Sequence, residues 1–315
     1  PQKSVCPIKE IGDGVIPCAI PYMMHTLSDP KQNAMGNTPL EKAGVEIVVG
    51  KVESLDAKTH TVKLKSGKTL SYERLVLATG TKPVLPPIEG IEKEGVFTIR
   101  KSMSAMKTLR DKAQKAKKVV IIGGGFIGAE FADELCKKSD VEVHLIEMMP
   151  QLLFTAFDDE FCDEISQILV KAGVSIHFGN RVASIDGNQN VESITLQTGL
   201  KIPADIVLVS IGAKPATKLA QEAGLRIVEN DSIWVDEYMR TDAEDVFAVG
   251  DCAVKRDFFT RKAAPVWLAS TATAEARNAG DGGELRLGHG VDDTAEAVRV
   301  LAELGFRQGT GEEEN

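Results

Sequence analysis

One stretch of the chain, residues 119–147, limits the possible folds more than any other. It opens with the apolar run 119–122, which is typical of a strand buried in a parallel sheet. Apolar residues then recur at helical spacing, and the run 141–146 predicts a second strand, with Glu147 at its end. A strand, a turn, a helix and a strand in this order predict one unit of a Rossmann-type α/β domain.

Three glycines, Gly123, Gly125 and Gly128, join the first strand to the helix in the order G-x-G-x-x-G. In such a loop the first glycine makes the tight turn, the second lets the backbone approach a pyrophosphate, and the third lets the helix pack on the strand. The helix N-terminus faces the phosphates, and an acid at the position of Glu147 accepts hydrogen bonds from a ribose. The glycines alone would also fit a turn in another α/β protein, but the complete order predicts a dinucleotide site.

Glu147 also narrows the choice of nucleotide. A carboxylate at this position repels a 2′-phosphate, whereas NADP sites usually offer an arginine nearby. Residues 148–151 (Met-Met-Pro-Gln) carry no positive charge. The sequence therefore favours NAD(H) over NADP(H).

Composition excludes several classes of protein. With 315 residues the chain is long enough for two domains, and a net charge of −9 argues against nucleic acid or an anionic membrane as a partner. No apolar run approaches the length of a membrane span. The five cysteines are widely spaced without a C-x-x-C, which favours reduced thiols in a cytoplasm over a disulfide scaffold or a zinc site. The five histidines offer no metal-ligand pair, so no metal is expected.

Three further buried strands are expected to end at glycines. The run 75–78 leads into Thr79-Gly80, the run 206–211 into Gly212, and the run 246–249 into Gly250-Asp251. Ligands bind at the carboxyl ends of strands in such sheets, where a glycine lets backbone come close. Together with the dinucleotide unit, these endings suggest a second nucleotide-like cofactor.

Other elements are expected from periodicity and turn residues. They are strands at 45–49 and 61–65 with a turn at 66–68, a proline-rich linker at 83–87, a helix near 158–172, strands near 174–178 and 191–197, and helices near 266–279 and at 291–306. Residues 309–315 are expected to form an acidic tail.

Four segments together resemble a known family. Residues 75–83 (LVLATGTKP), 119–147, 205–215 (DIVLVSIGAKP) and 241–251 (TDAEDVFAVGD) are similar, in this order, to the pyridine nucleotide-disulphide oxidoreductases. These are flavoprotein disulfide reductases with two dinucleotide-binding domains. The resemblance implies an α/β fold in which a Rossmann NAD domain is inserted into a Rossmann-like FAD domain, here incomplete. It divides the chain into a first FAD part (1–112), an NAD domain (113–245), a second FAD part (246–280) and a remainder of unknown role (281–315).

The same resemblance assigns residues to two cofactors, FAD and NAD(H). Near the flavin nucleotide it places Val52, Ala78, Thr79, Gly80, Gly250, Asp251 and Ala269, with Asp251 accepting hydrogen bonds from the ribityl chain. At the NAD site it adds Phe126, Ile127, Glu130 and Gly212 to the glycine loop and Glu147. Phe126 would be the aromatic gate over the isoalloxazine, and Glu130 would lie near the nicotinamide. Taken singly, Asp251 would also fit a helix cap and Phe126 a core position.

A fifth segment, residues 15–22 (VIPCAIPY), is similar to the single-cysteine branch of the family: coenzyme A disulfide reductases, persulfide reductases, NADH oxidases and NADH peroxidases. The resemblance makes Cys18 the redox-active residue. A thiolate attacks sulfur or peroxide, and a cysteine without a resolving partner forms a mixed disulfide or a sulfenic acid. Cys136, Cys162 and Cys252 are expected to be structural, and Cys6 is undecided.

Two departures from the family pattern stand out. Members begin with a strand and glycine motif for the FAD pyrophosphate, and this chain has none before Cys18, so its beginning is expected to be missing. Members also carry a C-terminal interface domain that makes a homodimer, and residues 281–315 show no match to it. The dimer is therefore doubtful here.

The sequence as a whole predicts an FAD-dependent enzyme that passes a hydride from NADH through flavin and Cys18 to a small disulfide or persulfide, such as coenzyme A disulfide. An NADH oxidase or peroxidase, with O₂ or peroxide as acceptor, remains an alternative because it would use the same cysteine. A non-catalytic NAD-binding subunit that has lost FAD is an alternative of another class.

Overall fold

The computed structural model describes residues 5–257, 259–264 and 266–281. Within them the chain forms two compact units. The first unit contains the described parts of residues 1–12, 36–82 and 214–315, and the second contains residues 13–35 and 83–213. The Cys18 segment thus belongs to the second unit, with the dinucleotide loop. The domain boundaries inferred from the family resemblance stay a prediction.

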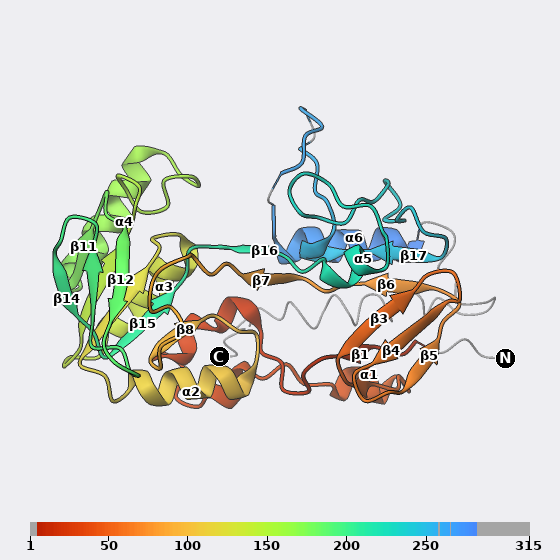
Figure 1. Ribbon diagram of the computed structural model, residues 1–315, viewed down its shortest axis with the longest axis horizontal. Helices are drawn as coiled ribbons and strands as arrows, with labels where there is room; N and C mark the ends of the chain where they lie inside the picture. The colour runs from red at the N-terminus through yellow and green to blue at the C-terminus, as the bar shows by residue number, and fades with distance from the viewer. Residues whose placement is uncertain (1–4, 258, 265, 282–315) are drawn as a thin grey trace, which may run out of the picture. The chain divides into compact units, whose positions relative to one another are not determined.

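The second unit is built on a five-stranded sheet in which all neighbours are parallel (Figure 1). Its order is β11 (Val174–His177), β10 (Glu142–Ile146), β9 (Lys118–Ile122), β15 (Ile206–Val209) and β8 (Val96–Thr98). Because β9 lies at the centre and pairs in register with β10 and β15, their carboxyl ends meet at one edge of the sheet. The glycine loop and Glu147 both lie at this edge.

Alternate residues of β9 enter two different cores, as the period of two in a strand requires. Val119 and Ile121 pack into one core with α2 (Met103–Ala113), α3 (Phe126–Cys136) and α4 (Asp159–Lys171). Val120 and Ile122 face the opposite core, under an antiparallel meander of β12 (Val182–Asp186), β13 (Ser193–Leu196) and β14 (Lys201–Pro203). The sheet is therefore covered on both faces, which explains the continuous apolar run in its central strand.

The first unit contains short sheets around a core of its own. Its strands are β1 (Ile8–Lys9) with β2 (Val48–Val49), the antiparallel β3 (Val52–Asp56), β4 (Thr61–Leu64) and β5 (Thr69–Ser71), and the parallel pair β6 (Leu75–Leu77) and β17 (Val246–Ala248). Its helices are α1 (Thr38–Lys42), α5 (Lys218–Glu222) and α6 (Ala269–Asp281). Short strands β7 (Thr81–Pro83) and β16 (Ala213–Pro215) lie where the chain passes between the units.

Most elements expected from the sequence are present, with two differences. The strand expected at 45–49 is reduced to Val48–Val49, and the helix expected near 266–279 begins at Ala269. The helix expected at 291–306 and the tail at 309–315 lie outside the described residues. None of the helices in the described ranges is long and apolar enough to cross a lipid bilayer.

Phe131 tests how far the second unit depends on its helix-side core. The side chain is 0% exposed at the centre of α3, against β9 and β10. We expect Phe131→Ala to lower the free energy of unfolding by about 3–5 kcal/mol, because it removes buried area and leaves a cavity. Urea denaturation measures this loss. Phe161→Ala is the matched control, since its ring on α4 is 63% exposed and its loss should change stability by about 0.5 kcal/mol or less.

Candidate functional site

The glycine loop has the close approaches that its sequence requires. Gly123 has a φ of +106°, and a Cβ there would lie 2.7 Å from the Ser210 carbonyl oxygen. A Cβ on Gly128 would lie 1.9 Å from the Gly123 carbonyl oxygen, so α3 approaches the loop as only glycine allows. Around Gly125 there is open space, and no side chain caps α3. The first N–H groups of an uncapped helix of this length form a site for phosphate groups.

Glu147 lies directly beside this loop, at the end of β10. Its carboxylate accepts hydrogen bonds from the backbone N–H groups of Gly124 and Met149, and the side chain is 8% exposed. Each carboxylate oxygen can accept more than one hydrogen bond, so a ribose hydroxyl can still be bound. The acid therefore holds the glycine loop in addition to the predicted ribose contact.

The first turns of α3 present apolar and acidic side chains together. Phe126 and Ile127 are 56% and 41% exposed, and Phe126 meets the ring of Phe157 edge-on, with 5.6 Å between centroids. Glu130, one turn on, remains solvent-accessible, and desolvation raises the pKa of its carboxyl group. Gly212 follows β15, which pairs with β9, so it lies at the same edge of the sheet. The structure thus brings together the residues expected at the NAD site.

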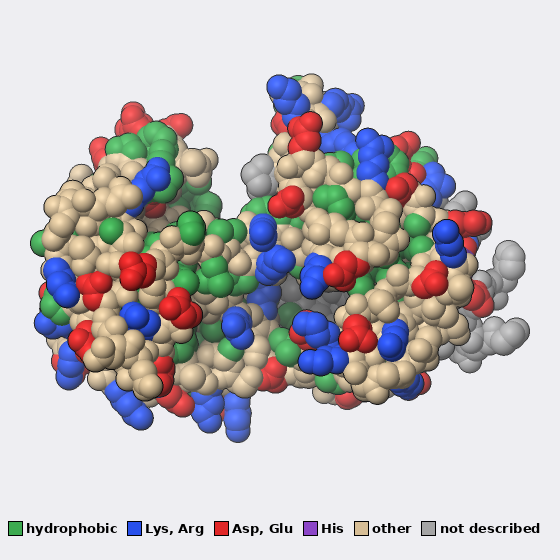
Figure 2. Space-filling model, viewed as in Figure 1, with side chains coloured by type: hydrophobic (Ala, Val, Ile, Leu, Met, Phe, Trp, Pro, Cys, Tyr) green, Lys and Arg blue, Asp and Glu red, His purple; other side chains and the backbone are tan. Residues whose placement is uncertain are grey.

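Sequence reasoning missed the aromatic residues before and in α4. Phe154, Phe157 and Phe161 are all more than 40% exposed, and Phe157 also contacts Phe161 at 6.2 Å between centroids. Hydrophobic side chains gather at the surface over the start of α4, with acidic side chains beside them (Figure 2). The signal in the sequence is the presence of three phenylalanines within eight residues, 154–161, at the expected start of this helix.

Cys18 lies in a short 3₁₀ turn, Pro17–Ala19, and its side chain is exposed. A second 3₁₀ turn, Pro21–Met23, follows at once, with Ile20 and Met23 buried in the helix-side core. The prolines at the start of both turns fix the backbone angle φ there. The thiol is thus presented to solvent by a backbone that is anchored on either side.

Three of the other four cysteines are more buried than Cys18. Cys6 is exposed, whereas Cys162 and Cys252 are buried and Cys136 is half-buried. Burial raises the pKa of the Cys136 and Cys252 thiols, and Cys252 donates to the carbonyl oxygens of Leu77 and Val249. Thiols in such surroundings are poor nucleophiles.

In the first unit, β6 and β17 are parallel, so their carboxyl ends lie side by side. Ala78-Thr79-Gly80 follows β6, Gly250-Asp251 follows β17, and Thr81 Oγ1 lies 3.5 Å from Asp251 Oδ2. Gly80 and Gly250 have φ angles of +63° and +73°, and a Cβ on Gly80 would meet nothing within 4 Å. Val52 begins β3 and Ala269 begins α6, both in this unit.

A buried ion pair, Lys255 and Glu275, binds both the N–H and the carbonyl group of Gly250. Glu275 Oε2 accepts the Gly250 N–H at 2.8 Å, and Lys255 Nζ donates to the Gly250 carbonyl oxygen. Lys255 Nζ and Glu275 Oε1 are 2.9 Å apart, and both side chains are no more than 10% exposed. This pair, which the sequence analysis did not find, fixes the turn that carries Asp251.

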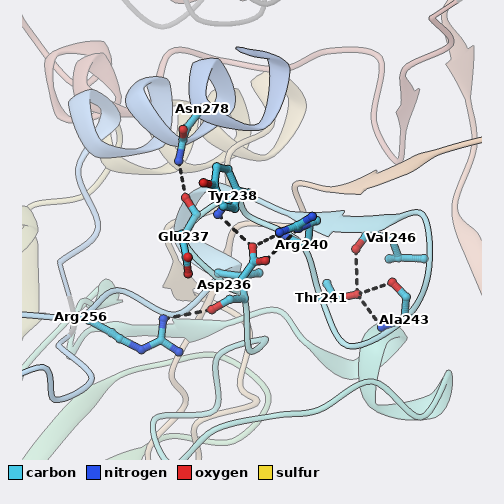
Figure 3. Close-up of polar contacts among 10 residues, drawn as sticks. Asp236, Glu237, Tyr238, Arg240, Thr241, Ala243, Val246, Arg256 and Asn278 are labelled. Carbon is cyan, nitrogen blue, oxygen red and sulfur yellow. Dashed lines mark hydrogen bonds and ion pairs between the residues drawn. The ribbon is translucent and has the colours of Figure 1, made fainter. Parts of the chain in front are cut away.

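The chain that leads into β17 is held by a second polar network (Figure 3). Asp236 accepts the backbone N–H groups of Tyr238 and Arg240 at 2.9 Å and Arg240 Nε at 2.8 Å. Asn278, on α6, donates to the Glu237 carbonyl oxygen. Asn278 and Glu275 are three residues apart, so one face of α6 holds both this turn and the Gly250 turn. Within the described residues, no group of three His, Cys, Asp or Glu side chains could hold a metal ion.

Comparisons with known proteins agree on one family. Residues 13–282 match the family described as Pyridine nucleotide-disulphide oxidoreductase. The NAD(P)H sulfur oxidoreductase (CoA-dependent) of Pyrococcus furiosus is 33% identical over 259 residues, which are 80% of this chain and 57% of that protein. An NADH oxidase of Methanocaldococcus jannaschii is 33% identical over 256 residues, 78% of this chain and 56% of that protein.

Solved structures give the same result. The NAD-dependent persulfide reductase from A. fulgidus superposes with a TM-score of 0.82 at 32% identity, over 89% of this chain and 54% of that one. The coenzyme A disulfide reductase CoADR-RHD of Bacillus anthracis superposes with a TM-score of 0.82 at 25% identity, over 91% of this chain and 53% of that one. The chain therefore spans little more than half the length of the relatives it matches.

Gly125 separates ligand binding from folding. Because a Cβ at Gly125 meets no protein atom within 4 Å, we expect Gly125→Ala to fold normally, with a stability loss of about 1 kcal/mol or less. The same Cβ occupies the space that a pyrophosphate needs, so the Kd for NADH should rise about tenfold or more. Titration calorimetry and thermal unfolding measure the two effects. Gly36→Ala, also in open space, should change neither; unaltered NADH affinity in Gly125→Ala would exclude this loop as the site.

Proposed function

The chain belongs to the pyridine nucleotide-disulphide oxidoreductase family, and we propose that it passes a hydride from NADH through FAD and Cys18 to a disulfide or persulfide acceptor. The α/β fold with two dinucleotide-binding domains, predicted from the sequence, is confirmed by the same match and by the similar solved structures. The observation that carries the proposal is Cys18, an exposed thiol in the unit that also contains the glycine loop.

The residues present fit both cofactors. The uncapped start of α3 and the open space at Gly125 suit the NADH pyrophosphate, and Glu147 suits its ribose. The glycine turns after β6 and β17, with Asp251 beside them, suit a flavin nucleotide. FAD, when bound, supplies the chemistry that converts a hydride into electrons for sulfur.

The chain's own contribution to the reaction is the thiolate of Cys18. Its Sγ attacks one sulfur of the acceptor disulfide, which forms a mixed disulfide and releases one thiol. The two electrons of the hydride then reduce the mixed disulfide, which releases the second thiol and restores Cys18. Overall, NADH, one proton and one disulfide give NAD⁺ and two thiols. Coenzyme A disulfide is our first candidate, because the Pyrococcus furiosus relative is described as CoA-dependent.

O₂ or peroxide is the second candidate acceptor. The Methanocaldococcus jannaschii relative is described as an NADH oxidase, and an exposed thiolate can also cycle through a sulfenic acid. Anaerobic reduction by NADH, followed by coenzyme A disulfide, polysulfide, O₂ or peroxide, separates the two proposals. A protein that binds NADH but no flavin would instead be a non-catalytic subunit.

Cys18→Ser should separate the two halves of the reaction. We expect the variant to lose coenzyme A disulfide reduction while NADH still bleaches the bound flavin, because hydride transfer precedes the thiol step. Stopped-flow absorbance measures the first half and free-thiol release the second. Cys6→Ser, the other exposed cysteine, is the matched control and should retain both halves. Coenzyme A disulfide reduction by Cys18→Ser at the wild-type rate would contradict the proposal.

Glu147 should determine the preference for NADH over NADPH. We expect kcat/KM to be higher with NADH, and Glu147→Gln to narrow that gap, because the charge that repels a 2′-phosphate is gone. The rate with NADH should itself fall about tenfold or more, since a hydrogen bond to a charged group contributes about 1.5–3 kcal/mol. Glu142→Gln, on the exposed start of the same strand, is the control. A wild-type protein that prefers NADPH would overturn the assignment.

A further inference from the structure

The chain that follows Cys18, residues 20–28, is held between two helices of the second unit. Ile20 and Met23 are 2% and 0% exposed and pack in the same core as Phe131 of α3 and Leu109 of α2. Apolar packing places this segment on the helices. Two charged side chains then bind its backbone, and neither is among the residues assigned to the cofactor sites.

Arg110, on α2, binds three carbonyl groups of the segment. Its Nη1 donates to the carbonyl oxygens of Met23 at 2.8 Å and Leu27 at 2.7 Å, and its Nη2 donates to that of Ser28 at 3.0 Å. The rigid fork of a guanidinium makes such a set of bonds selective for one backbone arrangement. Arg110 therefore fixes the course of the segment on one side.

Glu134, on α3, binds the segment from the other side. Its Oε2 accepts the Thr26 N–H at 2.8 Å, and its Oε1 accepts the Thr26 hydroxyl at 2.7 Å and Lys137 Nζ at 2.6 Å. The side chain is 1% exposed. Burial raises the pKa of this carboxyl group, but the hydrogen bonds from Lys137 and Thr26 outweigh it and bring the pKa below its ordinary value. Glu134 is therefore a buried carboxylate that accepts three hydrogen bonds.

The position of Glu134 on α3 connects this contact to the dinucleotide loop. Phe126, Glu130 and Glu134 follow each other at intervals of four, so they lie along one face of the helix. The helix begins at Phe126, and its N-cap is Gly125 of the glycine loop. A single rigid element thus carries the loop at its N-terminus and the bonds to the Cys18 segment two turns further on.

We propose that Glu134 and Arg110 are positioning residues: they hold the segment that follows Cys18 against α3 and α2, and thereby position the Cys18 turn for its reaction with the acceptor. The inference rests on the proposed function, because it assigns these residues to the thiol step. Neither residue acts on the acceptor directly. They act through Thr26 and the carbonyl groups of the segment. Removing their hydrogen bonds should slow the thiol step and leave the rate of hydride transfer unchanged.

Thr26 offers the mildest test, because its side chain is exposed and its replacement leaves the core intact. Thr26→Val keeps the shape and removes the hydroxyl that binds Glu134, whereas Thr26→Ser keeps the hydroxyl. In the FAD-loaded protein we expect Thr26→Val to reduce coenzyme A disulfide about tenfold more slowly. Thr26→Ser should stay within about twofold of the wild type, and the bleaching of flavin by NADH should be unchanged in both.

Glu134→Gln and Asp133→Asn form a second matched pair. Both remove a carboxylate partner of Lys137, but only Glu134 binds the Cys18 segment. The alkylation rate of Cys18 by iodoacetamide, followed by mass spectrometry, needs neither flavin nor acceptor. We expect this rate to change about threefold or more in Glu134→Gln and Thr26→Val, and to stay at the wild-type value in Asp133→Asn and Thr26→Ser.

The outcomes distinguish this inference from the proposed function. Unchanged Cys18 alkylation and unchanged disulfide reduction in Thr26→Val and Glu134→Gln would overturn the positioning role. An equal loss in hydride transfer and in the thiol step would also overturn it, because a purely structural defect has that effect. Disulfide reduction that survives Cys18→Ser would overturn the proposed function instead, whereas a change in Cys18 alkylation confined to Glu134→Gln and Thr26→Val would still support the positioning of the thiol.

Discussion

The peptide groups around Gly124 connect the separate parts of the dinucleotide site. The Gly124 N–H is bound by Glu147, and the Gly124 carbonyl oxygen accepts the N–H of Leu153. The first bond ties the loop to the end of β10, and the second ties it to the segment that carries Phe157. Because β10 is itself paired along its length with β9, the acid, the glycine loop and the aromatic segment are fixed to one sheet edge. A ligand therefore meets groups that are already in position.

The sequence predicted this edge of the sheet well because its signals are local. The apolar runs 119–122 and 141–146, the glycines between them and Glu147 lie within 29 consecutive residues, and each has one physical role. The strand predicted at 45–49 is too long, since only Val48 and Val49 pair with another strand. Short apolar runs do not show whether a partner strand is available.

The contacts that the sequence did not predict join residues far apart in the chain. Glu134 and Thr26 are 108 positions apart, and Arg110 and Met23 are 87 apart. A glutamate in the middle of a helix pattern is usually a solvated residue, and nothing near Glu134 in the sequence marks it as buried. The same holds for Lys255 and Glu275, whose pairing depends on how α6 packs on the Gly250 turn. Only the fold brings these partners together.

Glu134 and Glu275 illustrate why a protein keeps charged side chains in its interior. Burying a carboxylate is costly, and replacing a whole buried ion pair by apolar residues is often neutral for stability. Glu275 binds the backbone N–H of Gly250, in the turn that holds Asp251, and Glu134 binds that of Thr26, in the segment that follows Cys18. An apolar side chain would fill the same space but would leave that N–H without its partner. The two carboxylates therefore contribute to the geometry of the turns more than to the stability of the cores.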